Sequence, residues 1–523
     1  MRTYVQARAA AIGGDHRQAA QLLAALAQFQ PGQPDIAKRA LSEAIGTGQY
    51  DLALNLARSV PSAELNSDAR LLLVASEVRN HRLDRAQQWL AVKGDTGDLT
   101  FLTPLLTAWD AAESGNSQGA FAALDQITGK SLLTPLADEE RALMLLKFRR
   151  TAEAEPFARR AVGAAGARED RLRLAFADGF LAAGDKARAL MILDGMGGGA
   201  AAAKARINAG RSNGQAIDTG AKAFAEALNA FATDLARMQR ALPPVGLVQV
   251  SRFADPQNSS TATLLAVLLD RQDRSDEALA LLGTVGRDDA LISRVRDVQS
   301  RILIDQKRVN EAYQVAAAAI AAPGADQDDY SQIGEVYGAM KRFDLAADAY
   351  SKAIALATAQ GPRSDMWTLY LLQASAFEDA KRWPEAKAAL AKGLQLAPDQ
   401  PLLLNFLGYA KLEHGEDVDA AEAMIRKAAE LAPDDASITD SLGWAQFKRG
   451  KTAEAVSTLQ SAAEKDPAQA EIQEHLGDAL YKSGRRYEAR FAWSAALITA
   501  EDDIAGRVRA KLASGLNTAN AAP

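Results

Sequence analysis

The feature that most constrains this chain is a period of 34 residues near its C-terminal end, over residues 440–497. The same pattern of residue types occurs twice in this stretch. Its paired positions are Leu442 and Leu476, Gly443 and Gly477, Gly450 and Gly484, Ala455 and Ala489, Leu459 and Trp493, and Ala462 and Ala496. A fixed period of this length indicates a repeat protein, in which each repeat is one supersecondary unit that buries its apolar face against its neighbours. The period therefore predicts a solenoid.

Small and large residues occupy the positions that two packed antiparallel helices require. Gly and Ala stand where the helices approach closely, whereas Leu459 and Trp493 fill the gap between them. This order resembles the tetratricopeptide repeat, and the resemblance implies an all-α fold, a right-handed superhelix of helix-turn-helix repeats. Composition agrees, because 48% of the chain is hydrophobic but only 6% is aromatic, which favours closely packed alanine- and leucine-rich helices over a sheet.

The alanine that opens the second helix of each pair marks the repeats along the chain. In residues 1–194 the markers recur every 33 to 35 residues and predict an N-terminal array of about six repeats, at Ala19, Ala53, Ala86, Ala120, Ala154 and Ala189. In residues 259–498 they predict a C-terminal array of about seven repeats, at Ala278, Ala312, Ala346, Ala386, Ala421, Ala455 and Ala489. Helix pairs therefore account for most of the chain.

Two segments fall outside this register. Residues 195–258 begin with the run GMGGG and are interpreted as an irregular helical connector with degenerate repeats, flexible at its start, where the two arrays bend. The GMGGG run lacks the preceding strand and the following Lys-Ser/Thr of a phosphate-binding loop. Residues 499–523 are expected to form a helix that caps the open end of the solenoid, followed by a disordered tail.

Charge and residue types argue against several functions. A net charge of −6 without a block of Lys and Arg argues against nucleic-acid binding. The chain has no cysteine and therefore no thiolate metal site, disulfide or cysteine nucleophile. The four histidines, His16, His81, His414 and His475, lie in separate repeats without a second ligand at metal spacing. We expect no enzyme activity, metal or cofactor.

No apolar run is long enough to span a membrane, since the longest tight example is LLAVLL at 264–269. The first residues also lack the apolar region of a signal peptide and a cysteine for lipidation. The chain as written is therefore expected in the cytoplasm.

The run DSLGW at 440–444, together with HLGDALYKSGRRYEARFAWSAAL at 475–497, resembles large tetratricopeptide proteins of the proteobacterial cell envelope, many of them lipoproteins. The resemblance implies an adaptor at the periplasm or the outer-membrane periphery, which presents substrates to a C-terminal-processing protease or an assembly machine. The alternative is a cytosolic tetratricopeptide scaffold in a regulatory or secretion complex. Either protein would bind protein or peptide partners, and self-association through solenoid ends is compatible with both.

Residues of the first helix in each pair are expected to line the concave groove and to contact a partner. The candidate partner-binding residues are Asn405, Tyr409, Asp440, Trp444, Phe447, Glu474, Asp478 and Tyr481, and Glu471 belongs to the same set of groove positions. This groove is acidic with an aromatic centre, and such aromatic residues often dominate binding energy. The competing interpretation is that Trp444 and Phe447 are ordinary core.

The acidic groove also bears on the kind of partner. Tetratricopeptide domains that capture acidic chaperone tails use Lys, Asn and Arg at groove positions, where this chain carries mostly Asp, Glu, Ser and aromatic residues. A basic or mixed-polarity partner is therefore favoured over a chaperone tail.

Overall fold

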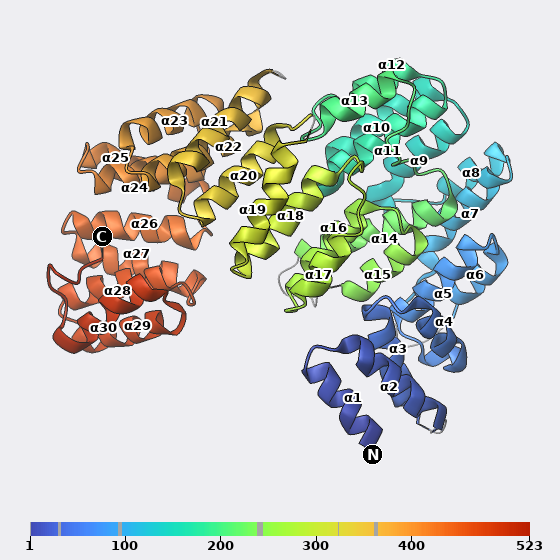
Figure 1. Ribbon diagram of the computed structural model, residues 1–523, viewed down its shortest axis with the longest axis horizontal. Helices are drawn as coiled ribbons and strands as arrows, with labels where there is room; N and C mark the ends of the chain where they lie inside the picture. Colours follow the sequence, from blue (N-terminus) through green and yellow to red (C-terminus); the bar gives the residue numbers. More distant parts are fainter. Residues whose placement is uncertain are drawn as a thin grey trace. The chain divides into compact units, whose positions relative to one another are not determined.

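The structure is a computed structural model that describes residues 2–29, 33–92, 97–237, 244–322, 324–359 and 364–522. Within these ranges all regular structure is helical, with thirty α-helices and five short 3-10 helices (Figure 1). The expected all-α solenoid is confirmed. None of the helices in the described ranges combines the length and apolar character needed to cross a bilayer. The chain divides into two compact units, Met1–Met340 and Lys341–Pro523, which are described separately.

The first unit opens with six helix pairs. They are α1 (Arg2–Ile12) with α2 (His16–Phe29), α3 (Pro34–Gly46) with α4 (Tyr50–Ser59), α5 (Ser67–Arg79) with α6 (Leu83–Leu90), α7 (Thr103–Glu113) with α8 (Ser117–Leu124), α9 (Ala137–Lys147) with α10 (Thr151–Ala164), and α11 (Glu169–Ala182) with α12 (Lys186–Ile192). The 3-10 helices η1 (Ser62–Glu64), η2 (Thr100–Leu102), η3 (Thr134–Leu136) and η4 (Gly166–Arg168) lie between them.

The first unit continues with three helices of irregular spacing and then returns to pairs. These are α13 (Ala200–Asn208), α14 (Gly220–Arg237) and α15 (Val245–Ala254), followed by α16 (Ser259–Asp270) with α17 (Ser275–Leu282), α18 (Ile292–Asp305) with α19 (Val309–Ile320), and α20 (Gln327–Ala339). The second unit contains α21 (Phe343–Ala359), η5 (Ser364–Met366), α22 (Trp367–Asp379), α23 (Trp383–Leu396), α24 (Pro401–Glu413), α25 (Val418–Leu431), α26 (Ala436–Lys448), α27 (Thr452–Lys465), α28 (Ala470–Lys482), α29 (Arg486–Thr499) and α30 (Asp502–Ser514).

The repeat pattern is explained by close packing within each pair. Every marker alanine lies in the second helix of its pair and is at most 1% exposed. A Cβ atom on Gly477 would lie 2.3 Å from Cδ1 of Trp493, and one on Gly443 would lie 2.6 Å from Cγ of Leu459. The glycine in the first helix and the large residue in the second are therefore two sides of one contact.

The turns between paired helices use the left-handed backbone conformation. Gly48 has a φ of 66°, and where another residue replaces the turn glycine, as at His81 and Arg149, the φ values are 53° and 59°. Non-glycine residues tolerate this conformation at a modest energetic cost, because it occurs at single residues.

Residues 195–258, interpreted from the sequence as a connector where the two arrays bend, pack onto the N-terminal array. Helix α15 packs against α3 and α5, and α14 packs against α5 and α7, so both lie against first helices of the N-terminal array. Tyr50 donates a hydrogen bond to Gln249, 199 residues away in the sequence, and the backbone N–H of Gly220 donates to Glu113 at 2.6 Å. The apolar residues of these helices explain the packing, since Phe224 and Val250 are fully buried. The first helices of the N-terminal array thus pack against α14 and α15, a later segment of the same chain.

Polar contacts strengthen this intramolecular packing. Arg168 forms ion pairs with Glu139 at 3.0 Å and with Glu226 of α14 at 2.8 Å, and all three side chains are buried. The extended stretch after α13 is fixed by Asp178, whose carboxylate accepts from the backbone N–H groups of Asn213 and Gln215, each at 2.7 Å. Side chains of one array therefore bind the following segment much as they would bind a peptide.

The GMGGG run, interpreted from the sequence as the flexible start of the connector, forms hydrogen bonds in the structure. Its backbone N–H groups donate to three carboxylates: Gly197 to Asp170 at 3.2 Å, Gly198 to Asp328 at 2.8 Å, and Gly199 to Asp326 at 2.5 Å. Successive N–H groups pointing the same way form an anion-binding concavity. In this chain the anions are its own aspartates: Asp326 and Asp328 join the run to the start of α20, and Asp170 joins it to α11.

In the second unit the first helices of successive pairs contact one another, α24 with α26, α26 with α28, and α28 with α30. This close spacing places them on the inner side of the curved helix stack. Helix α30 covers α28 and α29, as a terminal cap must. The tail, which was expected to be disordered, lies against α28 instead. Ala522 is 4% exposed and its N–H donates to Asp478 at 3.3 Å.

Candidate functional site

The eight predicted partner-binding residues all lie on first helices of the second unit, and they fall into three groups. Glu474, Asp478 and Tyr481 of α28 meet the cap helix α30. Trp444 and Phe447 of α26 stack together. Asn405 and Tyr409 lie one turn apart on α24, and the carboxylate of Asp440 on α26 acts electrostatically on Tyr409.

The group on α28 lies against the cap helix. Glu474 and Asp478 are 0% exposed, and the ammonium group of Lys511 donates to them at 2.6 and 2.7 Å. Asp478 also accepts from Nε1 of Trp493 at 2.9 Å, and Tyr481, which is half-buried, lies 5.4 Å from the same indole, centre to centre. The carboxylates of Glu474 and Asp478 are thus paired with the cap helix in this structure, which occupies the place that the next repeat would take.

The aromatic group packs within the helix stack. Trp444 is 1% exposed and stacks on His475 with ring centres 4.0 Å apart and an angle of 10° between the rings. Phe447 also stacks on Trp444, with ring centres 4.9 Å apart, and is half-buried. This stack joins α26 to α28, so Trp444 contributes to stability and is not presented to solvent.

The third group forms an acidic cluster, defined here as Asn405, Tyr409, Glu413, Asp440 and Glu471. Its members come from the three neighbouring first helices α24, α26 and α28. Glu413 and Glu471 are exposed, Asn405 and Tyr409 are half-buried, and Asp440 is 5% exposed. The cluster therefore runs from an exposed rim of two carboxylates to a buried carboxylate.

The electrostatics of the acidic cluster are those of a site for a cation. Burial, and then the carboxylates of Glu413, Glu471 and Asp440, raise the pKa of Tyr409. Asp440 bonds His475 at 2.9 Å through one oxygen, while its Oδ1 is buried and accepts no hydrogen bond from the described residues. Oδ1 of Asn405 is likewise buried and accepts no hydrogen bond from the described residues. Two buried acceptors beside a carboxylate rim suit an ammonium or guanidinium group.

The histidines do not converge on a site. Each bonds a carboxylate of another helix, in the pairs His16–Glu43 at 3.0 Å, His81–Glu113 at 2.9 Å, His414–Glu378 at 2.9 Å and His475–Asp440 at 2.9 Å. Although burial opposes it, the Asp440 carboxylate raises the pKa of His475. The four imidazoles therefore link helices within the helix stack.

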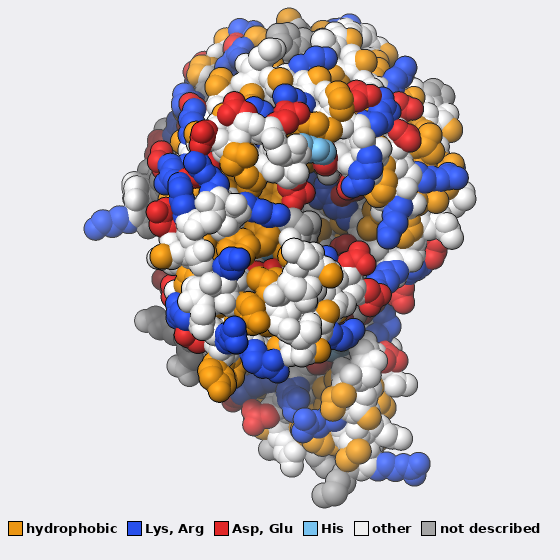
Figure 2. Space-filling view, turned by 90° about the vertical axis from the view of Figure 1, so that its left-hand side faces the viewer, with side chains coloured by type: hydrophobic (Ala, Val, Ile, Leu, Met, Phe, Trp, Pro, Cys, Tyr) orange, Lys and Arg blue, Asp and Glu red, His pale blue; other side chains and the backbone are white. Residues whose placement is uncertain are grey.

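Sequence reasoning missed Glu413 as a member of the cluster. It follows Tyr409 by one helical turn, and that spacing is the signal that could have identified it, because residues four apart lie on one helix face. Figure 2 views the molecule from the side on which α23–α30 are drawn, and Lys, Arg, Asp and Glu side chains are intermingled on this face.

Residues 441–468, which span most of α26 and α27, match the sequence profile of the tetratricopeptide repeat. No curated protein matches the chain.

Solved structures with similar helix arrangements include a chain of the APC/C hetero-tetramer Cut9–Hcn1, at 14% identity and a TM-score of 0.41, covering 99% of this chain and 96% of that chain. Yeast Tom70 has 10% identity and a TM-score of 0.40, covering 98% and 95%. A tetratricopeptide repeat protein from Parabacteroides merdae has 12% identity and a TM-score of 0.40, covering 49% and 98%. These scores are too low to transfer a partner or an activity to this chain. The chain is an all-α helix-pair solenoid that carries a tetratricopeptide repeat at residues 441–468.

Proposed function

We propose that the protein is a non-catalytic scaffold that binds a basic segment of a partner protein through the acidic cluster of its second unit. A lysine or arginine side chain of the partner enters between Glu413 and Glu471 and reaches the buried oxygens of Asp440 and Asn405. Protein binding is the general role of helix-pair solenoids, whose extended inner surfaces suit peptides.

The observation that carries this proposal is the pair of buried, unpaired acceptors at the base of the cluster. A buried polar atom without a partner costs about 1–3 kcal/mol, and a charged donor that pairs with it recovers that free energy on binding. Asp440 bonds His475 at 2.9 Å, and the rim carboxylates Glu413 and Glu471 add negative charge around Tyr409. A basic side chain satisfies both the charge and the hydrogen bonds.

A selection from displayed peptides tests the proposal with the full chain. Random peptides of about 12 residues span roughly 40 Å when extended, which is enough to cross several helices. We expect the wild-type chain to enrich peptides that contain Lys or Arg, and binding of these peptides to weaken with rising salt, since the Debye length is about 8 Å at physiological ionic strength.

A matched pair of double variants gives the site its control. Glu413→Gln with Glu471→Gln should weaken the enriched peptides by at least about tenfold. Glu454→Gln with Glu464→Gln removes the same charge from exposed positions of α27 and should leave binding unchanged. Equal effects of the two pairs, or enrichment of peptides without basic residues, would contradict the proposal.

The wider role follows from the resemblance of residues 440–444 and 475–497 to envelope adaptors. We propose that the bound partner is a substrate presented to an envelope protease or assembly machine, with a cytosolic regulatory or secretion scaffold as the alternative. Cell fractionation of the full-length chromosomal gene product, followed by co-purification with and without residues 341–523, distinguishes the two. Recovery of the protein in the cytoplasm would contradict the envelope role.

A further inference from the structure

Helix α29 of the second unit has two apolar faces. The buried face packs against α28 and α30 and contains Ala489, Ala492, Trp493 and Ala496. On the other side of the helix, Tyr487, Phe491 and Ile498 are 85%, 76% and 81% exposed. At about 100° per residue these three side chains fall within about 40° of one another and about 170° from the buried face. We call them the outer stripe of α29.

The outer stripe does not belong to the repeat pattern. The same positions one and two periods earlier, on α27 and α25, hold small or charged residues, each of them exposed: Ala453, Ser457 and Glu464, and Asp419, Ala423 and Glu430. The contacts between repeats therefore do not require large apolar side chains at these positions. A contiguous group of such side chains in solvent marks a surface that contacts another molecule.

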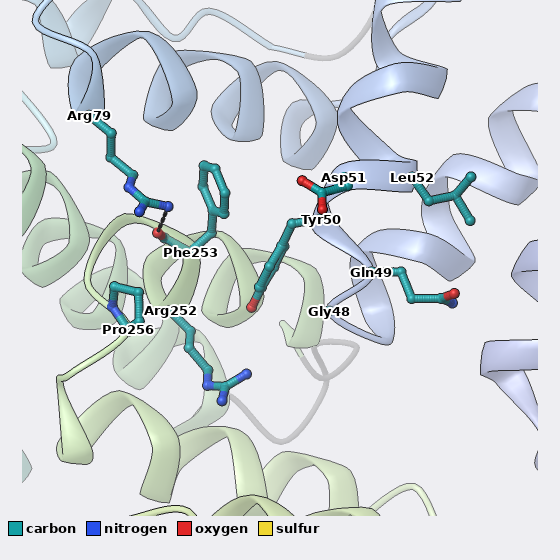
Figure 3. Close-up of a pocket in the computed structure, with 9 residues that line it drawn as sticks. All are labelled: Gly48, Gln49, Tyr50, Asp51, Leu52, Arg79, Arg252, Phe253 and Pro256. Carbon is teal, nitrogen blue, oxygen red and sulfur yellow. Dashed lines mark hydrogen bonds between the residues drawn. The ribbon is translucent and has the colours of Figure 1, made fainter.

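The exposure of Tyr487 and Phe491 contrasts with that of two aromatic residues in the first unit. Where α4 and α5 meet α15, beside a cavity of about 510 Å³, the rings of Tyr50 and Phe253 lie 5.0 Å apart and both are half-buried. Figure 3 shows these rings side by side, with Arg79 donating to the backbone carbonyl of Phe253. Those aromatic residues join helices of one chain, whereas the aromatic residues of the outer stripe face solvent.

The outer stripe is symmetric about the middle of its helix. Because α29 spans Arg486–Thr499, Tyr487 and Ile498 each stand one residue inside an end of the helix. Phe491 and Ser494 lie about 2 Å on either side of the midpoint. An antiparallel second copy of α29 therefore places Tyr487 of each copy opposite Ile498 of the other, and Phe491 opposite Ser494. Such an isologous contact uses the same surface of both copies.

The charges at the two ends of α29 fit the same antiparallel arrangement. The exposed cations Arg486 and Arg490 lie in its N-terminal half, and its C-terminal end is followed by the exposed carboxylates of Glu501, Asp502 and Asp503. Antiparallel copies bring the basic end of one helix to the acidic end of the other, whereas parallel copies bring like charges together. The helix dipole disfavours a cation at a helix N-terminus, and a carboxylate of the second copy offsets this cost.

The outer stripe is large enough for a weak dimer. Aromatic side chains bury about 150–250 Å² each when covered completely, so the exposed parts of the stripe amount to roughly 450 Å² in each copy. Two copies then bury about 900 Å² from the stripes, and the flanking side chains bring the total to the value of about 1,000 Å² at which specific interfaces begin. An interface of this size gives a dissociation constant in the micromolar range.

We propose that the protein forms a two-fold symmetric dimer through the outer stripe of α29, with the two copies of the helix antiparallel. Helices that lie on membranes also combine apolar and basic residues, but the carboxylates beyond the C-terminal end of α29 would repel anionic lipids. The stripe faces away from α28, so the dimer leaves the acidic cluster uncovered. The dimer would then bind two basic segments at once, and this consequence alone rests on the proposed function.

Sedimentation velocity of the full chain at about 1 to 100 μM tests the dimer. The triple variant Tyr487→Ala, Phe491→Ser, Ile498→Glu introduces the residue types that α27 carries at these positions, and it should weaken the dimer by at least about tenfold while the melting temperature is kept. The control Ile12→Glu with Phe29→Ser removes two equally exposed apolar side chains from the first unit and should leave the dimer unchanged. If the triple variant is unfolded, Phe491→Ser alone decides.

A charge exchange tests the antiparallel arrangement. Arg486→Glu should weaken the dimer, and adding Asp502→Arg should restore it, because the two side chains belong to opposite ends of the paired helices. A wild-type chain that stays monomeric, a dimer that the folded triple variant retains, or an exchange that restores nothing would overturn the proposal. So would a monomer that binds vesicles of anionic lipid through the stripe. Binding of basic peptides by the triple variant should be unchanged at the acidic cluster, so a failure of the dimer is distinguished from a failure of the proposed function.

Discussion

Lys511 provides the sharpest test of how the second unit is terminated. Its ammonium group is 0% exposed and lies between Glu474 and Asp478, which are equally buried. Replacement by methionine keeps most of the aliphatic stem and removes the charge. Two carboxylates then lose their shared cation in the interior, with only the partly exposed Arg507 remaining beside Glu474.

Removing one partner of a buried ion pair typically costs about 3–5 kcal/mol, because the remaining charge stays desolvated. For Asp478, burial already raises the pKa in the presence of Lys511. For Glu474, burial acts in the opposite sense to the hydrogen bonds from Arg507 and Lys511, and these lower its pKa. We expect Lys511→Met to destabilise the second unit by about 3–5 kcal/mol, or roughly 10 °C in melting temperature for a unit of this size.

The assay is urea unfolding combined with amide hydrogen exchange. Because a solenoid opens from its ends, exchange should accelerate first in α30 and the tail and then in α29. The control Lys482→Met removes an exposed charge from α28 and should change the unfolding free energy by less than about 0.5 kcal/mol.

A triple variant separates unpaired charge from lost packing. Adding Glu474→Gln and Asp478→Asn to Lys511→Met removes both stranded carboxylates and should restore most of the lost stability, as replacement of a whole buried ion pair often does. A Lys511→Met variant as stable as Lys482→Met, or a triple variant no more stable than the single one, would refute this reasoning.

Three further predictions concern the packing and electrostatics of the helix pairs. Gly477→Ala should destabilise the second unit by about 3 kcal/mol in urea unfolding, because its Cβ would overlap the indole of Trp493. Burial raises the pKa of Glu140 to about 8, so its contribution to stability is present below about pH 4.5 and is lost as pH rises through about 8. Glu140→Gln should flatten that part of the pH profile, and an unchanged slope would contradict the assignment. Gly198→Ala should lower the melting temperature of the first unit, because its Cβ would overlap the Asp328 carboxylate that accepts the Gly198 N–H, and an unchanged value would contradict that contact.

The helix pairs could be predicted from the sequence because their determinants are local and periodic. A small residue such as Gly443 or Gly477 in the first helix meets a large one, Leu459 or Trp493, in the second, so the period reports these contacts. The marker alanines, from Ala19 to Ala489, recur with the same period and are all buried. No period reports the packing of α15 on α3 and α5, because those contacts join residues about 200 positions apart that share no pattern.

The candidate site was predictable only in part, because position on a first helix does not determine exposure. Asp440 acts electrostatically on Tyr409, so these two groove positions lie near each other. Glu474 and Asp478 occupy equivalent positions but lie in the last repeat, where α30 and the tail cover them. The last repeat packs against the cap and not against another repeat, so its residues differ in exposure from those at equivalent positions. The sequence of the cap does not show which side chains it will bury.

The most direct test of the central claim is a crosslink from the acidic cluster to a bound peptide. A photo-reactive phenylalanine analogue at position 409 of the full chain, in place of Tyr409, is irradiated with a basic peptide enriched by the wild-type protein. The same analogue at Glu454, on the second helix α27, serves as the control. We predict a crosslink from position 409 to residues flanking a Lys or Arg of the peptide, and none from position 454. Equal labelling from both positions, or labelling from position 454 alone, would contradict the proposal that this scaffold binds its partner through the acidic cluster.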